Sequence, residues 1–203
     1  DHFYIKPEFL RGMSNNDFDN IIQQIDAHCG NLQGRQEQIL LTIQQHLDSG
    51  HADEQKQYII DMLTEAETTK KGQAFEVSSF SVLSVYLSFL GFTLHRYSTT
   101  YSNDGGIDFG AQNVIYQVTT KLTQEKFQED LKKAPGMKRI FVYRAISRNF
   151  NLHNFENELV VNHISKNELC DLVDHLSNKN STKFLPAILK TMLDEFKREF
   201  HQQ

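Results

Sequence analysis

The sequence has little of what marks several large protein classes. Only two cysteines, Cys29 and Cys170, occur among its 203 residues, and both lie in helical patterns. A disulfide framework is therefore not expected, and a reducing cytoplasm is the expected location. Apolar runs of about eighteen residues are missing, so no membrane-spanning helix is expected. The N-terminal residues do not have the basic-then-apolar order of a secretory signal.

Several well-known site motifs are missing as well. None of the nine histidines lies in a ligand pair such as HxxxH or beside a CxxC pair, so a zinc site is not expected. The sequence has no Walker loop, nucleophile elbow or dinucleotide-binding fingerprint. These absences argue against the commonest nucleotide-binding enzymes and serine hydrolases.

Charge is present but unevenly distributed. The chain is 39% hydrophobic and 23% charged, as folded proteins are, and its net charge is −5. Residues 1–69 carry −8 (four basic, twelve acidic), residues 70–150 carry +5 (eleven basic, six acidic) and residues 151–203 carry −2 (six basic, eight acidic). A basic middle third suits a polyanionic partner, although solvated helix faces alone could produce the same split.

The two flanks of the chain are predicted to be helical. In residues 1–69, apolar residues recur at helical spacing, and Gly30, Gly34 and Gly50 are expected to separate successive helices of an N-terminal appendage. In residues 151–203, a capping box from Ser165 to Glu168 and a second apolar stripe predict two further helices of a C-terminal strand and helical extension.

The middle of the chain, residues 70–150, changes character. The expected elements are a helix, three strands, a helix and a strand, over residues 72–90, 93–98, 107–111, 114–120, 124–134 and 138–144. Gln112-Asn113 suits a tight turn between the second and third strands. The predicted fold class is therefore α/β, with helical N- and C-terminal additions.

Chemistry-bearing residues fall on that expected hairpin. Asp108 lies between two apolar residues, and side chains alternate along a strand, so Gln117, Thr119 and Lys121 share one face of the next strand. Pairing through the turn brings Asp108 near Gln117. Carboxylate and amide oxygens are hard ligands that suit Mg²⁺, and a nearby ammonium can steady charge on a phosphate. The grouping predicts phosphodiester hydrolysis.

This layout resembles the PD-(D/E)xK nuclease superfamily, especially Mrr-like and type II restriction endonucleases. The segment Gly105 to Asp108 (GGID) matches the start of the family's second core strand, Gln117 matches the third strand, and the element order matches residues 72–144. The resemblance implies a restriction-endonuclease-like core and a Mg²⁺-dependent endodeoxyribonuclease of a bacterial restriction or defence system. Double-stranded DNA is the implied partner. Cleavage of a duplex needs two active sites or one acting twice, which a homodimer would supply.

One position departs from the family. Thr119 occupies the place of the usual lysine, and Lys121, two residues further on the same face, is the expected replacement. Glu76 continues the apolar stripe of the helix over residues 72–90, and family members often supply such a glutamate to the metal. The metal ligands implied are Asp108, Gln117 and Glu76, and the alternative is an inactive DNA- or partner-binding module on the same fold.

Further residues are candidates for nucleic-acid contacts. The polar loop after the first strand offers hydroxyls and an amide, and the basic middle third offers cations for phosphates. The candidates are Ser98, Thr99, Thr100, Ser102, Asn103, Lys132, Lys133 and Arg139, with Lys126, Lys138, Arg144 and Arg148 as weaker ones.

Overall fold

The computed structural model describes residues 15–64, 72–97, 107–133, 136–150 and 161–201. These described residues form a mixed five-stranded sheet and five helices, which confirms the predicted α/β class. The helices are α2 (Asn15–Ser49), α3 (Ala52–Thr64), α4 (Gln73–Phe89), α5 (Gln124–Lys132) and α6 (Lys166–His201). The strands are β1 (His95–Arg96), β2 (Phe109–Ala111), β3 (Val114–Leu122), β4 (Lys138–Ile146) and β5 (Val161–Ser165).

The sheet follows the order of the chain. Strands β1 and β2 and strands β2 and β3 pair antiparallel, whereas β3 and β4 and then β4 and β5 pair parallel. Gln112 adopts a φ of 52°, and with Asn113 it forms the predicted turn between β2 and β3. The parallel step from β3 to β4 needs a crossover, which α5 provides.

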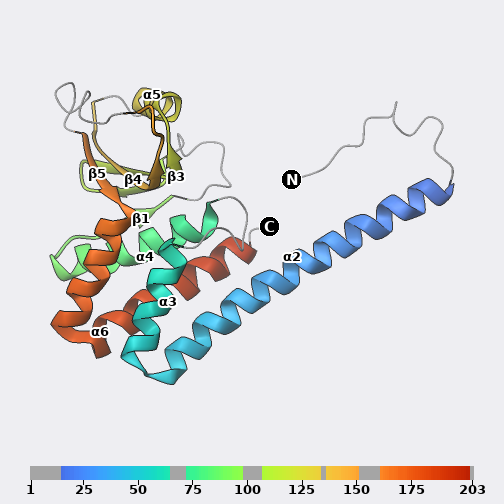
Figure 1. The fold of residues 1–203 in the computed structure, drawn as a ribbon, viewed down its shortest axis with the longest axis horizontal. Helices are drawn as coiled ribbons and strands as arrows, with labels where there is room; N and C mark the ends of the chain where they lie inside the picture. The colour runs from blue at the N-terminus through green and yellow to red at the C-terminus, as the bar shows by residue number, and fades with distance from the viewer. Residues whose placement is uncertain (1–14, 65–71, 98–106, 134–135, 151–160, 202–203) are drawn as a thin grey trace.

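The two faces of the sheet carry different helices (Figure 1). On one face Phe127 of α5 packs against Phe141 of β4, with ring centroids 4.7 Å apart. On the other face the apolar side chains of the sheet join α4 and α6, and Phe80 of α4 meets Phe109 of β2 edge-on at 5.2 Å. Each strand therefore alternates between two apolar layers.

The N-terminal helices join the main core only in part. Ile39 and Ile43 of α2, and Ile59 and Leu63 of α3, belong to the same buried cluster as α4, α6 and the sheet. The first half of α2 extends away from this body (Figure 1). Among the described residues, no helix is long and apolar enough to cross a membrane.

Several predicted boundaries are confirmed and others are wrong. Helix α4 ends as expected before Gly91, whose φ is 85°. The expected breaks at Gly30 and Gly34 are wrong, because α2 runs through both and ends before Gly50. Strand β1 is shorter than the predicted 93–98, and β2 begins directly after Asp108 rather than at residue 107.

The C-terminal helix is two helices joined at a kink, as predicted. Asn180 has a non-helical φ of −167° and ψ of 92°, and its Oδ1 accepts the backbone N–H of Lys183 at 3.1 Å. The first half begins with the predicted capping box, in which Ser165 Oγ accepts the N–H of Glu168 at 3.3 Å. The Glu168 carboxylate in turn accepts the N–H of Ser165 at 2.7 Å.

We expect Ser165→Ala to lower the free energy of unfolding by about 1 kcal/mol, because the first turn of α6 loses a partner for a backbone N–H. Urea denaturation of wild type and variant measures the difference. Asn167→Ala, an exposed change in the same turn, is the matched control and should leave stability nearly unchanged. Equal losses in the two variants would contradict the role of the cap.

Candidate metal and nucleic-acid site

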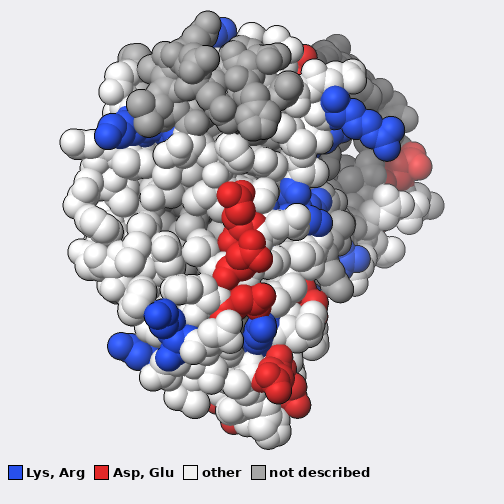
Figure 2. Space-filling view, turned by 60° about the vertical axis from the view of Figure 1, so that its left-hand side comes forward, with Lys and Arg blue, Asp and Glu red and all other residues white. Residues whose placement is uncertain are grey.

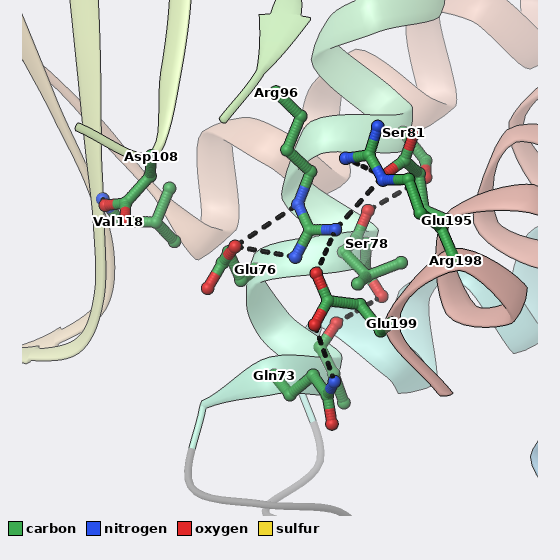
Figure 3. Close-up of polar contacts among 12 residues, drawn as sticks. Gln73, Glu76, Ser78, Ser81, Arg96, Asp108, Val118, Glu195, Arg198 and Glu199 are labelled. Carbon is green, nitrogen blue, oxygen red and sulfur yellow. Dashed lines mark hydrogen bonds and ion pairs between the residues drawn. The ribbon is translucent and has the colours of Figure 1, made fainter. Parts of the chain in front are cut away.

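Asp108 lies where β3 extends beyond β2. The last pair between these strands joins Phe109 to Tyr116, so residues 117–122 of β3 have no partner in β2. Oδ2 of Asp108 accepts the backbone N–H of Val118 at 2.7 Å (Figure 3). The same oxygen accepts a hydrogen bond from Nε2 of Gln117 at 3.1 Å. The carboxylate thus accepts a backbone N–H of β3 just beyond the last residue pair of β2 and β3. The expected proximity of Asp108 and Gln117 is confirmed.

The backbone of Asp108 also fixes the edge of the sheet. Its carbonyl accepts the N–H of Tyr97 at 2.9 Å, directly after β1. Gln117 is buried on the face that carries α5, beside Phe141 of the paired strand β4. The Gln117 amide turns its nitrogen toward Asp108, so a metal-binding role for its oxygen would require the amide to rotate by about 180°.

Glu76 of α4 is held by an ion pair. Arg96 of β1 donates to Glu76 Oε1 through Nε at 3.2 Å and Nη2 at 2.7 Å. The same guanidinium contacts Glu195 at 3.0 Å and Glu199 at 2.7 Å, both on the last turns of α6. We call Arg96, Glu76, Glu195 and Glu199 the Arg96 cluster; Figure 3 shows it beside Asp108.

The sequence analysis did not single out Arg96, although a signal for it exists. Leu94 and Arg96 are two residues apart, so they point to the same side of an extended segment, and Leu94 is buried. The Arg96 side chain is only 1% exposed. A buried guanidinium at this spacing requires carboxylate partners. Glu195 and Glu199 lie one helical turn apart near the end of α6.

The carboxyl groups of Asp108 and Glu76 both have a raised pKa. Burial raises the pKa of Asp108 to about 7, and the negative charge of Glu76 adds to this shift. The Val118 N–H and the charge of Lys126 lower the pKa of Asp108 in the opposite sense. Burial also raises the pKa of Glu76, against the lowering effect of Arg96. Asp108 and Glu76 therefore concentrate acidic groups in a desolvated place, which favours a cation there.

The cation that acts on Asp108 comes from α5, while Lys121 lies apart. Lys121 is exposed and pairs with Ala145, four residues beyond Gln117 and thus about 13 Å along β3. Lys126, on the first turn of α5, lowers the pKa of Asp108 by its charge, and its Nζ contacts Asp130 at 3.2 Å. The charge of Lys126 thus acts on Asp108, whereas Lys121 lies further along the strand.

The residues expected to contact phosphate lie in different surroundings. Lys132 is exposed, whereas Lys133 contacts the buried Asp130 at 2.7 Å. Arg139 is only 3% exposed, and its guanidinium donates to the backbone carbonyls of Asp130 and Lys133. Arg139 thus closes the end of α5 and is placed as a structural residue. The loop candidates Ser98, Thr99, Thr100, Ser102 and Asn103 lie outside the described residues, as do Gly105 and Gly106.

Surface charge on the face around β5 and the first half of α6 is mixed. Figure 2 shows a narrow column of acidic side chains there, with the described basic side chains of that view in small separate groups. A broad basic surface for a nucleic-acid backbone is therefore not formed by the described side chains of this face.

The chain matches no protein-family model, no curated protein and no solved structure.

The shifted pKa of Asp108 predicts a pH-dependent loss of stability. Its carboxyl titrates near 3.8 in an ordinary setting and near 7 in the fold, so the folded state binds the extra proton between these values. Stability should fall as pH rises from about 4 to about 7, by at most about 4 kcal/mol from this group. Urea denaturation in EDTA, at several pH values, measures it.

Asp108→Asn removes the titrating group and should remove that part of the pH dependence. Asp194→Asn, which changes an exposed carboxyl on α6, is the matched control and should retain it. If the free energy of unfolding changed equally with pH in wild type and Asp108→Asn, Asp108 would not be desolvated as described.

Proposed function

We propose that this chain is a Mg²⁺-dependent endodeoxyribonuclease with a restriction-endonuclease-like core, acting in bacterial restriction or defence. The observation that carries the proposal is the buried carboxylate of Asp108, which lies beside Gln117 where β3 extends beyond β2, with Glu76 close enough for its charge to act on Asp108. These acidic groups come from a strand start and a helix start, and the charge of Glu76 raises the pKa of Asp108. Such coupling at a sheet edge is typical of a cation site.

The arrangement of elements supports the same proposal. Helix α4, strands β1, β2 and β3, helix α5 and strand β4 follow one another in the order that the family resemblance implies. Within this order Glu76 lies on the first helix, Asp108 directly before the second strand and Gln117 on the third. Each occupies the element that the resemblance assigns to it.

The donor set suits Mg²⁺ better than a metal that needs a protein cage. Among the described residues, no group of three or more His, Cys, Asp or Glu side chains is placed to hold a metal ion. Mg²⁺ usually keeps several waters and binds one or two carboxylates together with substrate phosphate. Asp108 and Glu76 fit this smaller requirement, and a divalent cation would offset the charge that their burial concentrates.

The chain's own residues have distinct roles in this proposal. Bound Mg²⁺ would supply a water of lowered pKa and stabilise charge on the phosphate. Asp108 provides the main ligand through Oδ1, since Oδ2 is engaged by Gln117 and the Val118 N–H. Arg96 holds Glu76 in place by binding Oε1. Lys126 places an ammonium near the carboxylates, where it steadies negative charge on the phosphate.

The second candidate is a non-catalytic DNA- or partner-binding module on the same core. Two observations favour this module. Thr119 stands at the position where the family usually has its lysine, and one oxygen of the Glu76 carboxylate is already bound by Arg96. Metal binding separates the two functions. A nuclease should be stabilised by millimolar Mg²⁺ in a thermal melt, and the stabilisation should disappear in Asp108→Asn.

The decisive experiment is cleavage of supercoiled plasmid. Wild-type protein with Mg²⁺ should nick or linearise it, and EDTA should stop the reaction. Asp108→Asn should reduce the rate at least about 100-fold, because the main metal ligand is lost. Asp194→Asn is the matched control and should cleave normally. A folded wild-type protein that binds DNA, is not stabilised by Mg²⁺ and does not cleave would favour the binding module.

A second experiment separates the two candidate lysines. Lys126→Ala should reduce cleavage roughly 100-fold or more, the usual loss for a group acting on transition-state charge. Lys121→Ala should cleave near the wild-type rate. Lys126→Ala should also raise the pKa of Asp108, measured by carboxyl-carbon NMR, because the charge that lowers it is gone. The reverse pattern, with Lys121→Ala inactive and Lys126→Ala normal, would restore Lys121 to the role.

A further inference from the structure

The first half of α2 carries an apolar stripe that this chain leaves exposed. Helix α2 is 35 residues long, and residues 15–36, which we call the projecting half, extend away from the body (Figure 1). Ile22 is 41% exposed and Ile25 is 50% exposed, on the same side of the helix as Cys29 and Leu32.

The stripe has the spacing of a coiled coil. Its positions follow one another at alternating intervals of three and four residues, without interruption, through Ile22, Ile25, Cys29, Leu32, Gln36, Ile39 and Ile43. This is the heptad pattern of a supercoiled helix pair. Ile39 and Ile43 at the end of the stripe are buried against the body. One continuous seam is therefore covered in its second part and uncovered in its first.

A solitary helix of this length would be only marginally stable in water. About twenty residues without tertiary packing lie near the limit for isolated helices. Gly30 and Gly34 each cost roughly 1 kcal/mol of helix propensity relative to alanine. Both glycines lie away from the stripe, and a Cβ on either would meet nothing within 4 Å. The projecting half thus depends on a partner along the stripe.

We propose that the projecting half of α2 is an interface between two copies of this chain, which pair there as a parallel two-stranded coiled coil. In a parallel pair, each aliphatic position of the stripe meets itself, so every layer formed by Ile22, Ile25 and Leu32 is apolar.

Charge beside the stripe favours the parallel direction. Asp26 follows Ile25 at a position that flanks the seam. In an antiparallel pair centred on the projecting half, Asp26 would face Asp26 of the second copy, and like charges repel. In a parallel pair, Asp26 faces Ile21 of the second copy instead. This inference is independent of any nuclease activity, since it rests on α2 alone.

The molar mass in solution tests the association. Light scattering on the size-exclusion peak should give twice the 23.6 kDa of the chain. Ile22→Glu/Ile25→Glu should give the single-chain mass, with a far-UV circular dichroism loss of roughly twenty helical residues. Gln23→Glu/Gln24→Glu adds the same charge on the outer side and should remain a dimer. A wild-type monomer, or a dimer that survives the paired isoleucine changes, would overturn the proposal.

Disulfide trapping tests the direction. In a Cys170→Ser background, oxidation with copper-phenanthroline removes two electrons and two protons from two Cys29 thiols and joins them. A parallel pair places these residues in one layer, within the Cα separation that a disulfide spans. A covalent dimer should appear on a non-reducing gel and disappear in Cys29→Ser.

An antiparallel pair gives the opposite result. Cys29 would then face Ile25 of the second copy, and the two thiols would be offset by about 6 Å along the axis. A dimer in solution that forms no disulfide would therefore contradict the parallel arrangement.

Discussion

The burial of one guanidinium joins the start of α4, strand β1 and the last turns of α6. Arg96 lies on a two-residue strand that pairs with only one neighbour, and its side chain is 1% exposed. It joins that strand to Glu76 on α4 and to Glu195 and Glu199 on α6. Removing one partner of a buried ion pair costs far more than the pair itself contributes, so the cluster fixes one arrangement of these three elements.

The same cluster sets the electrostatics of the site. Arg96 and Arg198 face three carboxylates there, so acidic groups outnumber basic ones before Asp108 is counted. Burial is the main reason why the pKa of Glu76 stays raised despite its contact with Arg96, and the negative charges of Glu199 and Glu195 add to the rise. The negative charge of Glu76 in turn raises the pKa of Asp108. A bound cation would balance this excess of negative charge, as the proposed Mg²⁺ site requires.

Local features of the site could be predicted, and long-range ones could not. Strand alternation and a two-residue turn were enough to place Asp108 beside Gln117. The Arg96 cluster joins residues about a hundred positions apart, and no local pattern specifies that α6 returns to α4. Arg139 looked like a phosphate contact because its charge is visible in the sequence, whereas the carbonyls of the α5 end that satisfy it are not. Helix α2 continues through Gly30 and Gly34 although each lowers the local helix propensity, because the propensity of single residues is only a weak guide to where a helix ends.

The place of the lysine follows from the geometry of the sheet. Moving a lysine two residues along β3 keeps it on the same face but carries it about 7 Å further from Asp108. The helix that follows β3 packs on that face, with Phe127 against Phe141. Its first turn therefore lies over the strand residues that precede it. Lys126, one position before Phe127, thus returns toward Asp108, while Lys121 continues outward to solvent. The covering helix therefore supplies the cation that acts on Asp108.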